Sequence, residues 1–145
     1  MILLTPELGA ALRANDDARR AATIGGQAEP DPVPLVKFFN PCGAATWLAT
    51  ELQEDDDTLF GLADLGFGTP ELGYFSLSEI ASVRLPFGLC IERDLHFHTG
   101  HRLSTWAAWS RRAGSISAAE TLLRQLTRAA DGDEIPPPVD DEGSG

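Results

Sequence analysis

The chain has 145 residues, of which 43% are hydrophobic and 23% are charged, a composition that favours a soluble globular domain over a disordered chain. Acidic residues outnumber basic ones by 22 to 11, and a formal net charge of −11 excludes a protein that holds DNA by general phosphate attraction. No apolar run approaches the roughly 20 residues that span a bilayer, and the first residues do not resemble a secretory signal. We therefore expect a cytoplasmic protein that binds neither nucleic acid nor a membrane directly, while its oligomeric state stays open.

A helix is predicted at the start of the chain. Thr5 is a favourable N-cap and Pro6 suits the first helical position. Leu8 and Leu12 follow at helical spacing and give one apolar stripe. Residues 16–32 are polar and contain glycine and proline, so they are predicted to form a flexible loop within the domain.

Alternating apolar and polar residues then predict a series of strands. They are rich in β-branched and aromatic side chains and are separated by turn residues and acidic loops. The predicted strands span residues 33–39, 44–52, 59–65, 72–75 and 90–97. Because the connections between the first four are short, we expect an antiparallel meander of about five strands, with Trp47 and Leu48 on opposite faces.

Capping patterns predict three more helices. Residues 76–79 form a capping box that opens a short helix between the fourth and fifth strands. Ser104 is expected to cap the next helix, and Gly114 is expected to end it. Residues 117–120 form a second capping box, followed by leucines at helical spacing.

The predicted organisation is one domain and a tail. Residues 131–145 contain three consecutive prolines and six acidic residues, which predicts a disordered acidic tail. Residues 1–130 are predicted to form a single α+β domain. It would consist of the five-stranded meander, an N-terminal helix, a short inserted helix and two C-terminal helices.

Several segments resemble a known bacterial family. They are LLTPEL at 3–8, VKFFNP at 36–41, GAATWL at 43–48, FGL and DLG within 60–66, PELG at 70–73, and IERDLHF at 91–97. Over about residues 2–113 the sequence is similar to the family catalogued as domain of unknown function 2958. The family has no assigned activity, and its members tend to be encoded on plasmids and integrative elements near partition, conjugation and antirestriction genes. The resemblance thus implies an accessory protein of mobile elements, while His98, His101 and residues 115–145 fall outside the family pattern.

The segment 90–98 carries the sharpest chemical hypothesis. If it forms a strand, one of its faces carries five side chains able to ligate a metal or move a proton: Cys90, Glu92, Asp94, His96 and His98. The last four are the predicted metal ligands. Asp64 or Glu71 from neighbouring strands would supply a further ligand or a general base. A zinc- or manganese-dependent hydrolase or nuclease is therefore one alternative. The ordinary interpretation is the solvated polar face of a half-buried strand, with no cofactor.

Cys42 and Cys90 are weaker candidates for a functional site than the carboxylates and histidines of the segment 90–98. They are 48 positions apart and show no metal-binding C-x-x-C spacing. We expect two buried, reduced thiols rather than a catalytic nucleophile, although the sequence leaves a disulfide open.

The binding hypothesis rests on the next-to-last helix. Trp106 shares a side with Leu103, whereas Trp109 is followed by Arg111 and Arg112. Aromatic and arginine side chains are enriched at protein interfaces, so these three residues predict a contact patch. The preferred function is a small, acidic, non-catalytic accessory protein that acts through protein–protein contacts. Besides the hydrolase, the acidity suggests a DNA mimic that inhibits restriction enzymes.

Overall fold

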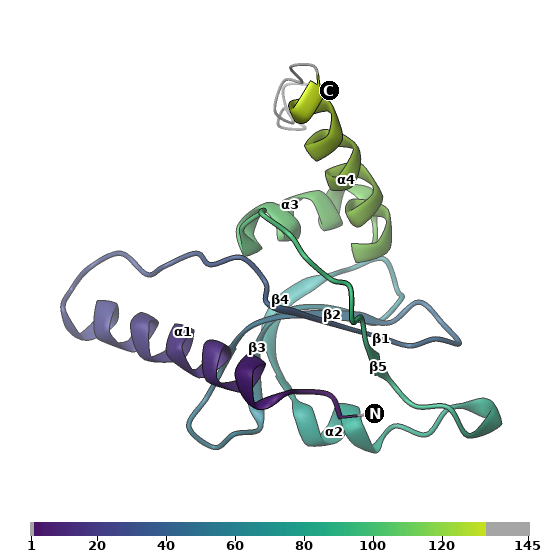
Figure 1. Ribbon diagram of the computed structural model, residues 1–145, viewed down its shortest axis with the longest axis horizontal. Coiled ribbons are helices and arrows are strands. Elements are labelled where there is room, and N and C mark those ends of the chain that lie inside the picture. The colour runs from purple at the N-terminus through teal and green to yellow at the C-terminus, as the bar shows by residue number, and fades with distance from the viewer. Residues whose placement is uncertain (1, 133–145) are drawn as a thin grey trace.

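The structure is a computed structural model that describes residues 2–132 (Figure 1). Its elements are α1 (Pro6–Ile24), β1 (Val36–Phe39), β2 (Thr46–Leu52), β3 (Thr58–Asp64), β4 (Glu71–Ser76), α2 (Leu77–Ser82), the 3-10 helix η1 (Pro86–Gly88), β5 (Glu92–Arg93), α3 (Leu103–Ala113) and α4 (Ile116–Gly132). The strands form one sheet in the order β4-β3-β2-β1-β5, and every neighbouring pair is antiparallel. The predicted α+β class and five-stranded antiparallel sheet are confirmed.

The sheet separates two hydrophobic cores. Trp47 belongs to the core on the α1 side together with Leu12 of α1. Leu48, the next residue of β2, belongs to the core on the other side with Trp106 of α3 and Leu123 of α4. Figure 1 shows α1 on one side of the sheet and α3 and α4 on the other. The predicted opposite placement of Trp47 and Leu48 is confirmed, as the alternation of side chains along a strand requires.

Helix α1 is longer than predicted, and the flexible-loop prediction is wrong for residues 16–24. Asp16 is fully buried, and its carboxylate lies 3.0 Å from Arg19 Nη2 and 2.8 Å from Arg20 Nε. Arg19 also bonds across to Glu51 of β2 at 2.8 Å. Ion pairs at i,i+3 and i,i+4 spacing support a helix, so the polar stretch forms the last turns of α1 rather than a loop.

The predicted strand at 90–97 is also wrong over most of its length. Only β5 pairs with β1, and the chain turns at Asp94, whose Oδ1 accepts a hydrogen bond from the amide of His96 at 2.9 Å. An aspartate side chain that binds the backbone two residues on ends a strand in a turn. As a result, Ile91 packs in the core on the α1 side and Phe97 against the core on the α3 side. The segment has no single polar face.

Three of the predicted helix boundaries are confirmed. Thr5 Oγ1 accepts from the amide of Leu8 at 3.1 Å, and Ser76 Oγ accepts from the amide of Glu79 at 3.1 Å. Gly114 ends α3 with a φ of 87°, in the left-handed region that glycine adopts without strain.

Two predicted caps are each wrong by two residues. Helix α3 begins at Leu103, and Ser104 bonds through both its amide and its hydroxyl to Asp31 in the loop that follows α1. Helix α4 begins before Ser117, and Ser115 Oγ accepts from the amide of Ala118 at 3.0 Å. In both cases a neighbouring polar side chain satisfies the backbone groups that open the helix.

The end of the described chain is helical. Helix α4 continues through Gly132, so the predicted tail does not begin at residue 131. The rest of the predicted tail, residues 133–145, lies outside the described residues. Within residues 2–132, no helix combines the length and the apolar character needed to cross a membrane.

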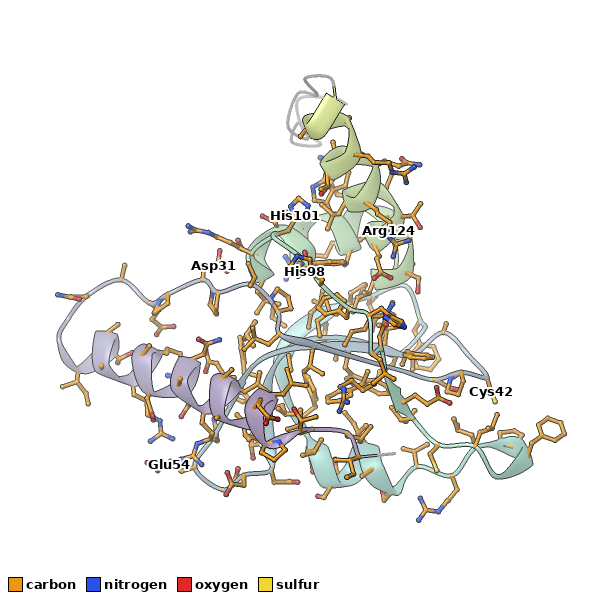
Figure 2. The ribbon with its side chains drawn as sticks, viewed as in Figure 1. Asp31, Cys42, Glu54, His98, His101 and Arg124 are labelled. Carbon is orange, nitrogen blue, oxygen red and sulfur yellow. The ribbon has the colours of Figure 1, made fainter. Side chains whose placement is uncertain are left out.

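Both cysteines are exposed, which corrects the expectation that they are buried. Cys42 and Cys90 are free thiols. Cys42 lies on the turn between β1 and β2, at one end of the sheet (Figure 2).

Candidate functional site

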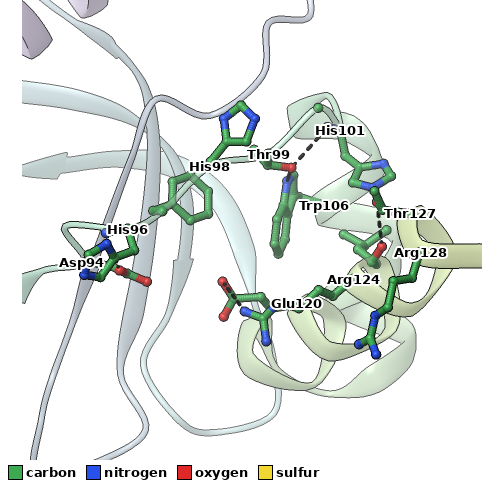
Figure 3. A pocket seen from close by; sticks show the side chains of 13 residues that line it. Asp94, His96, His98, Thr99, His101, Trp106, Glu120, Arg124, Thr127 and Arg128 are labelled. Carbon is green, nitrogen blue, oxygen red and sulfur yellow. Dashed lines mark hydrogen bonds and ion pairs between the residues drawn. The ribbon is translucent and has the colours of Figure 1, made fainter. Parts of the chain in front are cut away.

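Two pockets flank α3. The α4 pocket, of about 540 Å³, is lined by residues from 94–101, by Trp106 of α3, and by residues from 120–128 of α4 (Figure 3). The β4 pocket, of about 390 Å³, lies between residues 29–32, the start of α3 and the sheet. Its sheet wall consists of Thr50, Glu51, Phe60, Leu72 and Tyr74.

The structure brings together only part of the predicted metal or catalytic set. Three of these residues line the α4 pocket: Asp94, His96 and His98. His101, which was not in the predicted set, lines the same pocket. Glu92 lies on β5 outside this lining, and Glu71 is the first residue of β4, at the opposite edge of the sheet.

Asp64 has a structural role. It is 1% exposed, and its two oxygens accept hydrogen bonds from the amides of Gly66 and Ile116, both at 2.9 Å. The second bond ties the end of β3 to the first turn of α4, where a carboxylate also stabilises the helix dipole. Because both oxygens are engaged there, Asp64 is not positioned as a general base for the α4 pocket.

The α4 pocket offers no set of three metal ligands. Among the described residues, no three histidine, cysteine, aspartate or glutamate side chains come close enough to hold a metal ion. His96 and His98 are exposed, and Asp94 lies 3.6 Å from Lys37 Nζ. The geometry therefore gives the zinc or manganese hypothesis no ligand arrangement to build on.

An ion-pair network forms one wall of the α4 pocket. Lys37 Nζ lies 2.7 Å from Glu120 Oε1 and 3.6 Å from Asp94 Oδ2. Arg124 Nη2 lies 3.4 Å from the other Glu120 oxygen, and the arginine side chain remains 64% exposed. Both carboxylates beside the pocket are therefore neutralised by cations, one of which comes from β1 and one from α4.

The β4 pocket also contains a buried charge. The Glu51 side chain is 5% exposed and accepts from Arg19 Nε at 2.8 Å. Burial raises the pKa of the Glu51 carboxyl above its ordinary value, and the bond from Arg19 opposes this effect. Beside this pair, the rings of Phe60 and Tyr74 lie with their centroids 5.0 Å apart. The pocket thus combines an ion pair with an aromatic surface.

Strand β4 forms an open edge next to this pocket. It is the outermost strand of the sheet, and among the described residues only β3 pairs with it. The amide of Leu77 donates to the carbonyl of Asp57 at 2.9 Å, so the amide of Leu77 points toward β3. Amides along an antiparallel strand point alternately toward and away from the neighbouring strand. In the β3–β4 register, the amides of Phe75 and Gly73 therefore face β3, and those of Tyr74 and Leu72 face outward. The side chains of these same two outward-facing residues line the β4 pocket.

The predicted contact patch is divided by helix geometry. Trp106 is buried, whereas Trp109 is partly exposed, with Arg112 Cζ 5.9 Å from its ring centroid. Arg111 is exposed but projects from a different side of α3, because positions two apart on a helix do not face each other. A role of Trp109, Arg111 and Arg112 in binding stays a prediction.

The β4 pocket was not predicted from the sequence. The alternation of Leu72 and Tyr74 places them on one face, and this signal was present in the sequence. The edge position of β4 and the approach of residues 29–32 depend on long-range pairing. A strand pattern alone does not reveal either of them.

Comparison with known proteins gives one result. Residues 3–117 match the model of the family described as protein of unknown function (DUF2958). No curated protein and no solved structure matches the chain. The matched region contains the whole sheet, α3 and every residue that lines the β4 pocket, but it stops before the α4 wall of the α4 pocket. Because the match covers most of the chain, the protein belongs to the DUF2958 family.

Proposed function

We propose that this chain is a small, acidic, non-catalytic accessory protein that binds a basic protein partner. The partner would supply an extended segment that pairs with β4 as an additional strand. One observation carries the proposal: the outward-facing residues of an open edge strand also line a pocket. A role in mobile genetic elements is part of the proposal and is supported by the family resemblance alone.

The two edges of the sheet differ in how they are protected. Strand β5 has two residues, and such a short strand offers little backbone for another chain to pair with. Strand β4 has six residues and contains neither proline nor lysine, the residues that commonly protect an edge. An unprotected edge of this length suits strand addition, in which main-chain hydrogen bonds supply affinity.

The β4 pocket would supply specificity. A strand added beside β4 would place every second side chain next to Leu72 and Tyr74, at the mouth of the pocket. These two side chains are 40% and 58% exposed, so a neighbouring strand would remove apolar surface from water. Alternate side chains of an added strand are the ones that pockets of this kind select.

The charges around the β4 pocket favour a basic segment. Glu29, Asp31 and Glu51 line the pocket with a single arginine, Arg19. A lysine or arginine of the partner would find carboxylates and the exposed ring of Tyr74, which attracts a cation through its face. The net charge of −11 would also steer a basic partner toward the protein.

The four acidic residues at 54–57 support a DNA mimic less than they support a structural role. Asp56 pairs with Arg13 at 2.8 Å, and Glu54 pairs with Arg20 at 3.2 Å. Asp55 accepts hydrogen bonds from the hydroxyl and the amide of Thr58 and from the amide of Asp57, and these bonds lower the pKa of its carboxyl to about 2. These carboxylates hold the β2–β3 turn and α1 together rather than standing as a free row of charges.

A pair of designed peptides tests the proposal. One alternates lysine and valine, and the other carries glutamate in place of lysine. We expect saturable binding of the lysine peptide only, measured by calorimetry at moderate salt. Leu72→Pro removes an outward amide and should abolish binding, whereas Leu72→Ala keeps that amide and should only weaken it. Equal effects of the two variants, or equal binding of both peptides, would contradict strand addition.

A further inference from the structure

The α4 pocket points to a second binding site. We infer that it binds a small organic oxyanion, meaning a carboxylate or phosphate carried on an apolar body. Its volume of about 540 Å³ falls within the range of small-molecule sites, roughly 300–1,000 Å³. The inference is independent of the proposed partner at β4, because the two pockets share no lining residue.

A hydroxyl group with a proton to donate lines this pocket. Thr99 Oγ1 accepts hydrogen bonds from Trp106 Nε1 at 3.2 Å and from the amide of His101 at 3.1 Å (Figure 3). A hydroxyl oxygen has two lone pairs and one proton, so these two bonds use its acceptor capacity. Within residues 2–132 the Thr99 proton is therefore left for an acceptor, and Thr99 lines the pocket. A ligand oxygen would satisfy it.

His101 is oriented by a similar chain of bonds. Thr127 Oγ1 donates to the carbonyl of Leu123 at 3.0 Å and lies 3.0 Å from His101 Nε2. Because the Thr127 proton is already used, its oxygen accepts from His101, which places a proton on Nε2. The bond to Thr127 of α4 thereby fixes the orientation of the His101 imidazole at the wall of the pocket.

The pocket lining contains two arginines that could contact an anion. Lys37 is shared between Asp94 and Glu120, and Arg124 gives Glu120 a second cation. Arg128 follows Arg124 by one helical turn and also lines the pocket. Lys37 lies outside the lining, which itself carries Arg124 and Arg128 against Asp94 and Glu120. Because Lys37 already pairs with both carboxylates, an anion would meet the two arginines and the Thr99 hydroxyl there, in a protein that is otherwise strongly acidic.

The apolar part of the ligand also has a surface to contact. Phe97 is half-buried, and its ring centroid lies 6.1 Å from that of Trp106. Both rings and Leu123 line the pocket. An apolar body would pack on them while its charged group reached Thr99 and the arginines. The expected ligand therefore combines an oxyanion with an apolar or aromatic group.

Binding of three small probes tests the inference. Phenyl phosphate and phenylacetate carry the two oxyanions, and benzyl alcohol is the neutral control; binding is followed by tryptophan fluorescence and calorimetry. We expect saturable binding of at least one anion and weaker binding of benzyl alcohol. Binding of only one anion identifies the oxyanion. Failure of both anions, or equal binding of benzyl alcohol, would overturn the inference.

Matched arginine variants locate the site. Arg128→Gln should weaken binding of the preferred anion roughly tenfold, because it removes a charge-assisted contact. Arg111→Gln removes the same charge from an exposed position on α3 outside the pocket and should change affinity less than about twofold. Equal losses would show general attraction and overturn the site. Leu72→Pro should leave anion binding intact, which separates this test from that of the β4 partner.

Discussion

At Glu51 two effects act on one carboxyl group in opposite directions. Burial disfavours the charged form, and the bond from Arg19 favours it. Burial is the larger effect, so the folded-state pKa lies above the ordinary value of 4.5. The folded protein therefore binds this proton more tightly than the unfolded chain does. The corresponding stabilisation is present below the unfolded pKa and is lost as the pH rises through the folded pKa.

Glu51→Gln tests this linkage. Glutamine keeps a hydrogen-bond acceptor for Arg19 but does not titrate. We expect the free energy of unfolding of the wild type, relative to that of the variant, to fall as the pH rises from below 4.5 to neutrality. Urea unfolding of both proteins across this range measures the difference. A difference that is constant, or that grows with pH, would show that burial does not dominate at Glu51.

Asp16 offers a sharper test of the buried ion pairs. Its carboxylate is fully buried and holds both Arg19 and Arg20. Asp16→Asn should lower the free energy of unfolding by about 2–3 kcal/mol, less than a fully buried pair would lose, because the arginines reach solvent. The control is Asp17→Asn at the neighbouring exposed position, which should cost less than about 0.5 kcal/mol. Similar losses in chemical denaturation would mean that the buried pairs contribute little.

At the scale of elements, β3 lies too close to β2 at Gly61 to accommodate a side chain. A Cβ atom at this position would overlap the carbonyl oxygen of Leu48 and lie 2.8 Å from its carbonyl carbon. The obstacle is backbone, which cannot rotate away as a side chain can. Gly73 is paired with Gly61 across the β3–β4 ladder, and a Cβ there would meet nothing within 4 Å.

This contrast predicts opposite outcomes for the same substitution. Gly61→Ala should destabilise the domain by about 3 kcal/mol or more, because the strands must separate or bend. Gly73→Ala should change stability by less than about 1 kcal/mol, since alanine fits an exposed edge and restricts the unfolded chain. Thermal and urea unfolding give both values. A small loss of stability in Gly61→Ala would mean that the backbone of β2 can move away from β3 at this point.

The elements also show what sequence patterns can predict. Alternation identified β1 to β4. In β2 and β3 it places successive residues in opposite cores, as Trp47 and Leu48 demonstrate, and in β1 it places Val36 and Phe38 in the core on the α1 side. It failed at β5 because a local bond between Asp94 and the amide of His96 competes with the strand ladder. The sequence pattern did not predict the last turns of α1, because residues 16–24 look like a polar loop. Asp16 can be buried there only because Arg19, in the same polar segment, pairs with its carboxylate.

The candidate sites were less predictable for a related reason. The sequence shows that the segment 90–98 is rich in ligating groups, but it does not show which residues of other elements surround that segment. Lys37 and Glu120 are 83 positions apart in sequence and meet only through the pairing of β1 and the packing of α4. The β4 edge likewise exists only once the strand order is known. Such contacts are a property of topology, which local spacing does not encode.

At the scale of the whole molecule, two candidate binding surfaces lie on either side of α3. The β4 edge and its pocket lie within the region that matches the family, whereas the α4 wall of the second pocket lies beyond it. A partner site shared by the family and a ligand site particular to this chain would be consistent with that division. Trp109 belongs to neither pocket lining.

Trp109→Ala therefore distinguishes the β4 edge from the contact patch predicted on α3. If the partner segment binds at β4, the variant should bind the lysine–valine peptide with an affinity within about threefold of the wild type. A circular dichroism spectrum serves as the control for folding, because Trp109 also packs against the core on the α3 side. Complete loss of binding in a folded variant would move the interface to Trp109 and Arg112.

Amide hydrogen exchange at β4 shows whether a partner segment pairs with this strand. Exchange would be followed by NMR for the protein alone and for the protein saturated with the lysine–valine peptide. We predict that the amides of Leu72 and Tyr74, which face outward in the free protein, become protected in the complex. The amides of Gly73 and Phe75, already bonded to β3, should change little. Peptide binding that leaves Leu72 and Tyr74 as exchangeable as before would contradict strand addition.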